Sequence, residues 1–112
     1  MKLFWKYLGL SFLIVAIPVF SFSQTSNKSF KLAVAQMRVD GGDRLANLDH
    51  AGEMIAEASQ NGAQIILLPE AMDLGWTDPS ALTQAEPIPE GKTAVFLSNM
   101  ARKYKVYICS GL

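Results

Sequence analysis

Three short runs of apolar residues, separated by segments long enough to hold a helix, constrain the fold of this chain most strongly. They span residues 30–37, 63–68 and 106–112. In the first run both alternating sets of side chains are mostly apolar, which is typical of a strand inside a sheet that is covered on both faces. Parallel strands need a long crossover connection, usually a helix, and both intervals can provide one. The pattern therefore predicts an α/β layered sheet.

The interval between the first two runs predicts an amphipathic helix over residues 44–60. Its apolar residues recur at the spacing of a single helical face: Leu48, Ala51, Ile55 and Ala58. Asp43 is suited to cap the start of this helix, because its carboxylate can accept a hydrogen bond from a free backbone N–H group. Gly62 is suited to the left-handed conformation in which many helices end.

The second interval predicts a long loop followed by another helix. Residues 71–91 contain three prolines and two glycines, with one helical turn expected over residues 81–85. Residues 92–104 again show helical periodicity, and Arg102 and Lys103 in the last turn suit the helix dipole. The predicted order is β, α, β, long loop, α, β. Three strands and two helices leave much of an apolar sheet uncovered, so we expect more chain or a partner to cover it.

The first 23 residues have the features of a secretory signal peptide. Lys2 and Lys6 precede an uncharged apolar run of about 13 residues, and Ser21 and Ser23 are small residues of the kind that precede a cleavage site. A retained membrane anchor is the alternative, but the run is shorter than the roughly 20 residues that span a bilayer. We therefore expect an exported protein, periplasmic or secreted, with a linker at 24–30 and one domain fragment at 31–112.

Composition argues against several kinds of partner. Without residues 1–23 the chain holds 8 basic and 10 acidic residues, a net charge of −2, and no basic run with interleaved aromatic residues. This balance does not favour nucleic acid or an anionic membrane surface as a partner. Cys109 is the single cysteine, which excludes an intrachain disulfide, and His50 is the single histidine. We expect neither a metal site nor an organic cofactor.

Glu70 is the strongest candidate for a catalytic residue. It directly follows the second apolar run, and ligands of open α/β sheets bind beyond the carboxyl ends of the strands. Pro69 before it has a fixed φ and no N–H group to donate. Partial desolvation at the mouth of an apolar strand makes a carboxylate a better general base near neutral pH. The alternative is a solvated glutamate at a strand-to-loop junction.

The segment Ile66-Leu67-Leu68-Pro69-Glu70 resembles the one that carries the catalytic glutamate in the nitrilase, or carbon–nitrogen hydrolase, superfamily. Other landmarks agree in order: residues 32–37, Asn47 in the first helix, residues 61–63, Gly75-Trp76, residues 87–91 and the third apolar run. The resemblance covers residues 31–112. It implies the N-terminal part of a nitrilase-like αββα sandwich, about its first third, in an incomplete chain.

The resemblance also implies a chemistry. Enzymes of this superfamily hydrolyse nonpeptide amide, nitrile or related C–N bonds with a Glu, a Lys and a Cys. The thiol forms a thioester, the glutamate acts as general base, and the lysine stabilises the oxyanion. Only Glu70 can be carried over to this chain, because the family's Lys and Cys come from later segments. We therefore expect residues 1–112 alone to be inactive, and the full-length protein to act on a small amide or nitrile and to form a homo-oligomer.

Several further residues are weighed as site candidates. Trp76 and Asp73, in the loop after Glu70, are candidate substrate-binding residues, with loop packing as the alternative. Cys109 is not expected to be the nucleophile, because it lies within an apolar strand, where a buried cysteine behaves as a small hydrophobic residue. Lys92 and Lys103 are predicted as helix-surface residues. A non-catalytic secreted α/β module, or a truncated inactive relative, stays open as the other function.

Overall fold

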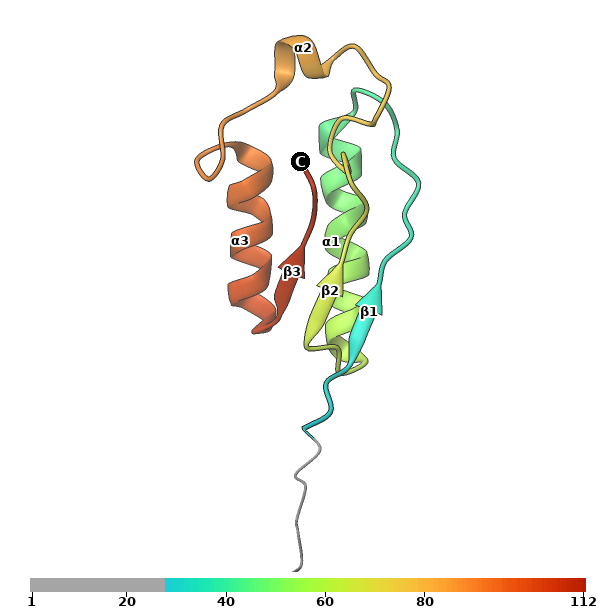
Figure 1. Cartoon of the computed structure of the whole chain (residues 1–112), viewed down its shortest axis with the longest axis vertical. Helices are drawn as coiled ribbons and strands as arrows, with labels where there is room; N and C mark the ends of the chain where they lie inside the picture. The colour runs from blue at the N-terminus through green and yellow to red at the C-terminus, as the bar shows by residue number, and fades with distance from the viewer. Residues whose placement is uncertain (1–27) are drawn as a thin grey trace, which may run out of the picture.

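Residues 28–112, which the computed structural model describes, form a parallel sheet with helices packed on one face (Figure 1). The elements are β1 (Leu32–Val34), α1 (Arg44–Gln60), β2 (Ile65–Leu67), α2 (Ala81–Gln84), α3 (Lys92–Tyr104) and β3 (Tyr107–Cys109). This order confirms the predicted succession of strands and helices. The signal peptide predicted for residues 1–23, and most of the predicted linker, lie outside the described residues.

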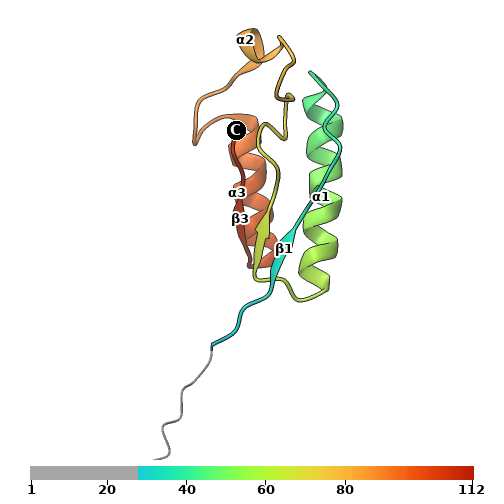
Figure 2. The same cartoon turned by 45° about the vertical axis from the view of Figure 1, so that its right-hand side comes forward.

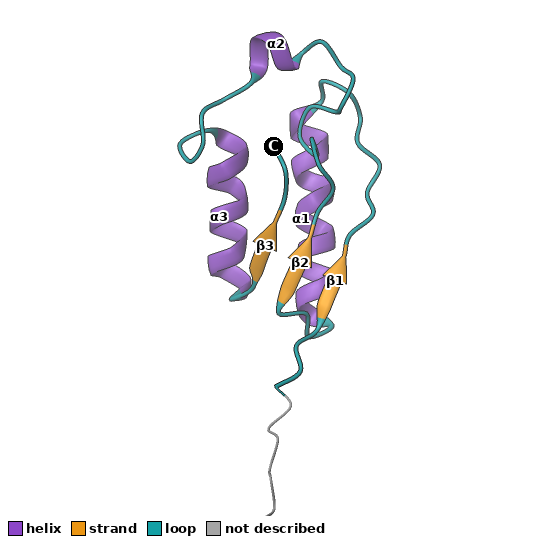
Figure 3. Ribbon diagram, viewed as in Figure 1, coloured by secondary structure: helices purple, strands orange, loops and turns teal. Residues whose placement is uncertain are grey.

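The three strands are parallel and stand in the sheet in the order of the chain, β1-β2-β3. In the register, Ala33 pairs with Ile66, and Ile66 pairs with Ile108. Crossovers between parallel strands are almost always right-handed, so two successive crossovers in the same direction place their helices on the same face. Figure 2 shows α3 behind β3 and α1 to the right of β1, and residues of both helices pack in the same core cluster. Figure 3 shows the three strands pointing toward one edge.

Helix α1 begins and ends where the sequence predicts. The Asp43 carboxylate accepts a hydrogen bond from the backbone N–H of Ala46 at 3.1 Å, as expected for an N-cap. Gly62 has a φ of +82°, which confirms the left-handed conformation after the helix. Helix α3 likewise spans the predicted residues, with Arg102 and Lys103 in its last turn.

The core lies between the helices and one face of the sheet. Ala51 and Ile55 of α1 and Ile66 of β2 are fully buried, and Phe96 of α3 packs against this cluster. On the opposite face of the sheet the side chains are exposed: Leu32, Val34, Leu67, Tyr107 and Cys109. One helical layer on one sheet is half of the predicted αββα sandwich. The uncovered apolar face agrees with the expectation that residues 28–112 alone leave the sheet partly open.

The strands are shorter than the apolar runs that predicted them. Regular pairing in β2 stops before Pro69, which has no N–H group to donate to the sheet. After β1 the chain continues alongside β2, since the Ala35 N–H donates to Leu67 O at 2.8 Å, and then turns away. No helix within residues 28–112 has the length and apolar character needed to cross a membrane.

Candidate active site

The segments that follow the three strands meet at one edge of the sheet, where Figure 3 shows the loops gathered beyond the arrowheads. The loop after β1 contacts the loop after β2, because Gly42 N–H donates to Leu74 O at 2.9 Å. The chain after β3 contacts the same loop, because Ala71 N–H donates to Gly111 O at 2.9 Å. Parallel strands thus bring three distant parts of the sequence into one candidate site.

Asn47 is the residue that connects two of these loops. Its side chain is 1% exposed, its carbonyl oxygen accepts from Asp40 N–H at 2.8 Å, and its amide group donates to Asp40 O at 2.7 Å and Asp73 O at 2.8 Å. All three polar bonds are therefore made to backbone groups that a loop would otherwise leave unpaired. Sequence reasoning noted Asn47 only as a landmark of the resemblance. Its position four residues before Ala51, on the buried face of α1, was the signal for a structural role.

Glu70 lies where the chain leaves β2 and enters the site. Its backbone is held between two hydrogen bonds to the end of β3, from Leu68 N–H to Cys109 O and from Ala71 N–H to Gly111 O, both 2.9 Å. Ala71 has a φ of +50°, an uncommon conformation for a residue with a Cβ atom. The Glu70 side chain is exposed, so the expected partial desolvation is wrong for residues 28–112. The reason is that Glu70 faces an open hollow, whereas Leu68 and Met72 on either side of it are buried in the core.

Glu70 and Trp76 line the same hollow, which has a volume of about 370 Å³. The hollow is formed by Val39, Gly41, Glu70, Ala71, Gly75, Trp76, Thr77 and Asp78. The Trp76 ring is 73% exposed, so it is available to a ligand that enters beside Glu70. The structure thus brings together two of the three predicted site residues.

Asp78 adds negative charge to this hollow. The hydroxyl and the backbone N–H of Ser80 hold the pKa of the Asp78 carboxyl below its usual value, since both stabilise the charged form. The backbone N–H of Ser80 donates to Asp78 Oδ1 at 2.9 Å. The hollow beside Glu70 therefore contains a second carboxylate, and its lining holds no lysine, arginine or cysteine from residues 28–112.

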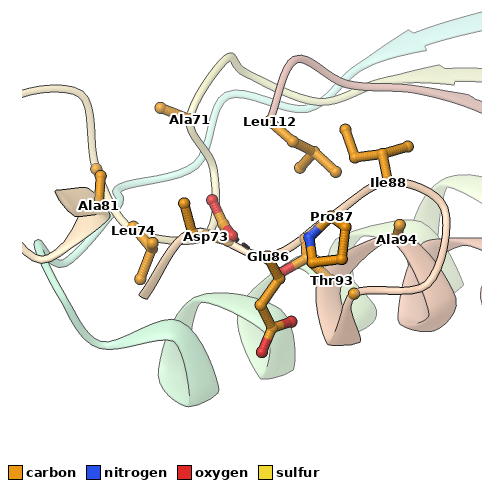
Figure 4. Close-up of a pocket in the computed structure, with 13 residues that line it drawn as sticks. Ala71, Asp73, Leu74, Ala81, Glu86, Pro87, Ile88, Thr93, Ala94 and Leu112 are labelled. Atoms are coloured by element: carbon orange, nitrogen blue, oxygen red, sulfur yellow. Dashed lines mark hydrogen bonds between the residues drawn. The ribbon is translucent and has the colours of Figure 1, made fainter. Parts of the chain in front are cut away.

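Asp73 lies in a different pocket, of about 180 Å³, between the loop after β2 and the start of α3. In Figure 4 its carboxylate points toward Thr93, whose hydroxyl donates to Asp73 Oδ2 at 2.9 Å. Arg44 Nε lies 3.5 Å from the same oxygen. With a side chain only 14% exposed, Asp73 is engaged by neighbouring protein groups. Its predicted role as a substrate-binding residue stays a prediction.

Arg44 joins this pocket to the loop before α3. Besides Asp73, its guanidinium contacts Glu86 Oε1 at 3.0 Å and donates to the backbone oxygen of Gln84. Glu86 in turn accepts a hydrogen bond from the backbone N–H of Lys92, at the start of α3. Sequence reasoning missed this network. The one local signal was the position of Arg44 in the first turn of a helix. A cation is unfavourable there because of the helix dipole, so carboxylate partners are expected nearby.

The remaining candidates fall outside the hollow. Cys109 lies in β3 as predicted, but its side chain is exposed, so the expectation of a buried cysteine is wrong for the described residues. It is exposed because it faces the side of the sheet that carries no helices. Lys92 and Lys103 are exposed helix residues, as predicted, and His50 is exposed on α1. Within residues 28–112, no three His, Cys, Asp or Glu side chains gather closely enough to hold a metal ion.

Comparison with known proteins assigns the family. Residues 31–112 match the sequence profile of the family described as carbon–nitrogen hydrolase. The chain belongs to the carbon–nitrogen hydrolase family. The match begins one residue before β1 and includes every strand and helix of the described structure.

Individual relatives in this family are nitrilases and omega-amidases. A nitrilase of Pyrococcus abyssi is 39% identical over 84 residues, which cover 72% of this chain and 32% of the relative. A chloroplastic omega-amidase of Arabidopsis thaliana is 31% identical over 86 residues, 73% of this chain and 23% of the relative. The omega-amidase NIT2-A of Xenopus laevis is 35% identical over 82 residues, 73% of this chain and 29% of the relative. The chain therefore spans about a third or less of the length of these carbon–nitrogen hydrolases.

Proposed function

We propose that the complete protein hydrolyses a nonpeptide C–N bond of a small amide or nitrile, with Glu70 as general base. The observation that carries the proposal is the placement of Glu70. It stands at the carboxyl edge of a parallel sheet in a carbon–nitrogen hydrolase, fixed by two backbone hydrogen bonds and facing a hollow of about 370 Å³. A positioned carboxylate that is open to a small ligand is what general base catalysis requires.

The proposed chemistry needs two groups from outside residues 28–112. Glu70 takes the proton of a cysteine thiol while the sulfur attacks the substrate carbon, and a lysine stabilises the oxyanion of the tetrahedral intermediate. For an amide, the C–N bond then breaks, the proton leaves with ammonia, and a thioester remains. For a nitrile, attack of the sulfur first gives a thioimidate, and a water molecule adds to it before ammonia leaves and the same thioester remains. Glu70 then takes a proton from water, whose oxygen attacks the thioester carbon, and the acid product and free thiol are released.

The relatives and the hollow support the proposed substrate class. The relatives named above are a nitrilase and omega-amidases, so we propose an amide or nitrile of a small molecule as substrate. Trp76 is proposed to contact it, because the ring is exposed in the hollow that holds Glu70. For Asp73 the hydrogen bond from Thr93 and the ion pair with Arg44 favour a role in holding the loop.

The test is Glu70→Gln in the complete gene product, with ammonia release measured on a panel of small amides and nitriles. Loss of the general base should lower kcat about 10²- to 10⁴-fold, while the denaturation midpoint stays unchanged because the Glu70 side chain is exposed. Glu53→Gln is the matched control, since it makes the same change on the exposed side of α1 and should retain full turnover.

A second candidate function is a non-catalytic secreted α/β module or a truncated inactive relative. Full ammonia release by the Glu70→Gln protein would refute the role of Glu70. A complete gene product that releases no ammonia from any substrate would favour the non-catalytic module.

We also propose that the protein acts outside the cytoplasm and as a homo-oligomer. The signal-like segment in residues 1–23 supports export, and mass spectrometry of the native protein should find an N-terminus at Gln24. An intact Met1 in the native protein would instead support the membrane-anchored alternative. The mass of the native assembly in solution tests the oligomeric state.

A further inference from the structure

Among the glycines in residues 28–112, Gly111 is the one at which an added Cβ atom would meet Glu70. A Cβ atom built at Gly111 would lie 2.8 Å from Glu70 Cγ and 3.5 Å from Glu70 Cβ. The first distance is shorter than real Cβ contacts allow, so any other residue at 111 would collide with the Glu70 side chain. The glycine therefore leaves room for Glu70 to take the conformation that it has.

The backbone of Gly111 does not itself require glycine. Residues 42, 62 and 75 are the glycines with positive φ within residues 28–112, and Gly111 is not among them. An alanine at 111 would therefore meet no conformational strain of its own. What excludes a side chain at this position is the neighbouring Glu70.

The contact is held in place from both sides. The chain after β3 runs beside the chain after β2, with Leu68 N–H donating to Cys109 O and Ala71 N–H donating to Gly111 O, each at 2.9 Å. Between these bonds the Ser110 hydroxyl donates to Pro69 O at 3.2 Å. Neither backbone can move away without breaking these bonds. The collision between a new side chain at 111 and Glu70 must therefore be relieved by rotation of the Glu70 side chain.

We propose that Gly111 is a positioning residue for Glu70. Because Gly111 has no side chain, the end of β3 lies in close contact with the Glu70 side chain, and this contact fixes the direction of the carboxylate. This inference rests on the proposed function. Rotation of Glu70 to another staggered conformation moves its carboxylate away from the thiol and the water that it must deprotonate. A displacement of about 1 Å in a catalytic group can cost on the order of 10²-fold in rate.

The test is Gly111→Ala in the complete gene product, compared with Glu70→Gln and with Gly52→Ala. For Gly111→Ala we expect kcat to fall about 10- to 100-fold with KM changed less than about threefold, because the substrate pocket persists and the base is misdirected. Gly52→Ala is the matched control. It places a Cβ 3.2 Å from the Phe96 ring, between α1 and α3, and should leave kcat unchanged.

A double-mutant cycle on unfolding supplies a readout that does not depend on turnover. Glu70→Ala removes the Cγ atom, so the loss in denaturation midpoint caused by Gly111→Ala should fall by half or more in that background. If Gly111→Ala is insoluble alone but folds together with Glu70→Ala, the same coupling is established. If it is insoluble in both backgrounds, or equally destabilising in both, the contact with Glu70 is not the reason for the glycine and the inference is overturned.

The kinetic outcomes separate the inference from the function on which it rests. If Glu70→Gln is inactive and Gly111→Ala keeps kcat within twofold of the parent, the positioning role is refuted and the general base stands. If Glu70→Gln retains full turnover, the proposed function fails, and with it any catalytic meaning of the Gly111 contact.

Discussion

Glu70 and Asp73 are carboxylates three residues apart in one loop, and they differ in exposure and in side-chain partners. Asp73 is 14% exposed, accepts a hydrogen bond from Thr93 and pairs with Arg44. Glu70 is exposed, and its side chain makes no hydrogen bond or ion pair with another residue in the range 28–112. Its backbone, by contrast, is fixed to the end of β3.

One loop can therefore serve both stability and chemistry. A carboxylate that is buried with a cation and a hydroxyl is committed to the native structure, because removing a partner leaves an uncompensated charge. A carboxylate with a fixed backbone and an unengaged side chain can accept protons from a ligand. Asp73 thus holds the loop in which Glu70 is presented.

The largest loss of stability is expected from removing the cation that pairs with Asp73. Arg44→Met removes the cation that contacts Asp73, Glu86 and the Gln84 backbone. Breaking a largely buried ion pair leaves unpaired carboxylates, so we expect the free energy of unfolding to fall by about 2–4 kcal/mol. Denaturant unfolding of the complete protein measures it.

The chain offers a matched control for this change. Arg38 pairs with Asp40 at 3.0 Å, but the two side chains are 87% and 55% exposed. An exposed pair contributes little to stability, so Arg38→Met should leave the unfolding midpoint nearly unchanged. Equal losses for the two arginine variants would contradict the structural role of the Arg44 network.

A smaller effect compares the two carboxylates directly. Asp73→Asn keeps the shape of the side chain and removes its charge, which weakens the hydrogen bond from Thr93 and removes the ion pair with Arg44. We expect a loss of about 1–2 kcal/mol in the free energy of unfolding. Glu70→Gln makes the same chemical change at the exposed position and should cost less than about 0.5 kcal/mol. A Glu70→Gln loss as large as that of Asp73→Asn would show that both carboxylates are structural.

The helices and the general position of the site follow from local patterns in the sequence. Asp43, the apolar stripe of α1 and Gly62 predict where α1 begins and ends, because each acts within a few residues along the chain. Glu70 is predicted as a site residue because it directly follows an apolar strand, where α/β sheets bind ligands, and because residues 66–70 resemble the segment that carries the catalytic glutamate in the nitrilase superfamily. These features needed no knowledge of distant contacts.

The contacts that distinguish Glu70 from Asp73 could not be read in this way. Arg44 and Glu86 are 42 residues apart, and Glu70 meets Gly111 from 41 residues away. Such pairs depend on the order of strands and on the path of the loops, which composition and periodicity do not specify. Exposure was misjudged for the same reason, since Cys109 lies on a strand face that no helix within residues 28–112 covers.

The smallest expected effect concerns the backbone between the two carboxylates. Ala71 has a φ of +50°, where a Cβ atom is unfavourable by roughly 1–2 kcal/mol. Ala71→Gly relieves this cost but adds about 0.4–1 kcal/mol of conformational entropy to the unfolded chain. The net expectation is a gain of about 0.5–1 kcal/mol in the free energy of unfolding.

Ala85→Gly gives this last prediction its control. Ala85 has a φ of −57°, which any residue adopts, so glycine there adds unfolded-state entropy without relieving strain and should lower stability. Opposite signs for the two alanine-to-glycine changes, measured by the shift in denaturation midpoint, would establish that the loop holds Glu70 against a backbone preference. A lower denaturation midpoint for both variants would mean that the turn after Glu70 stores no strain. The hydrogen bonds to β3 alone would then fix the path of the backbone at this turn.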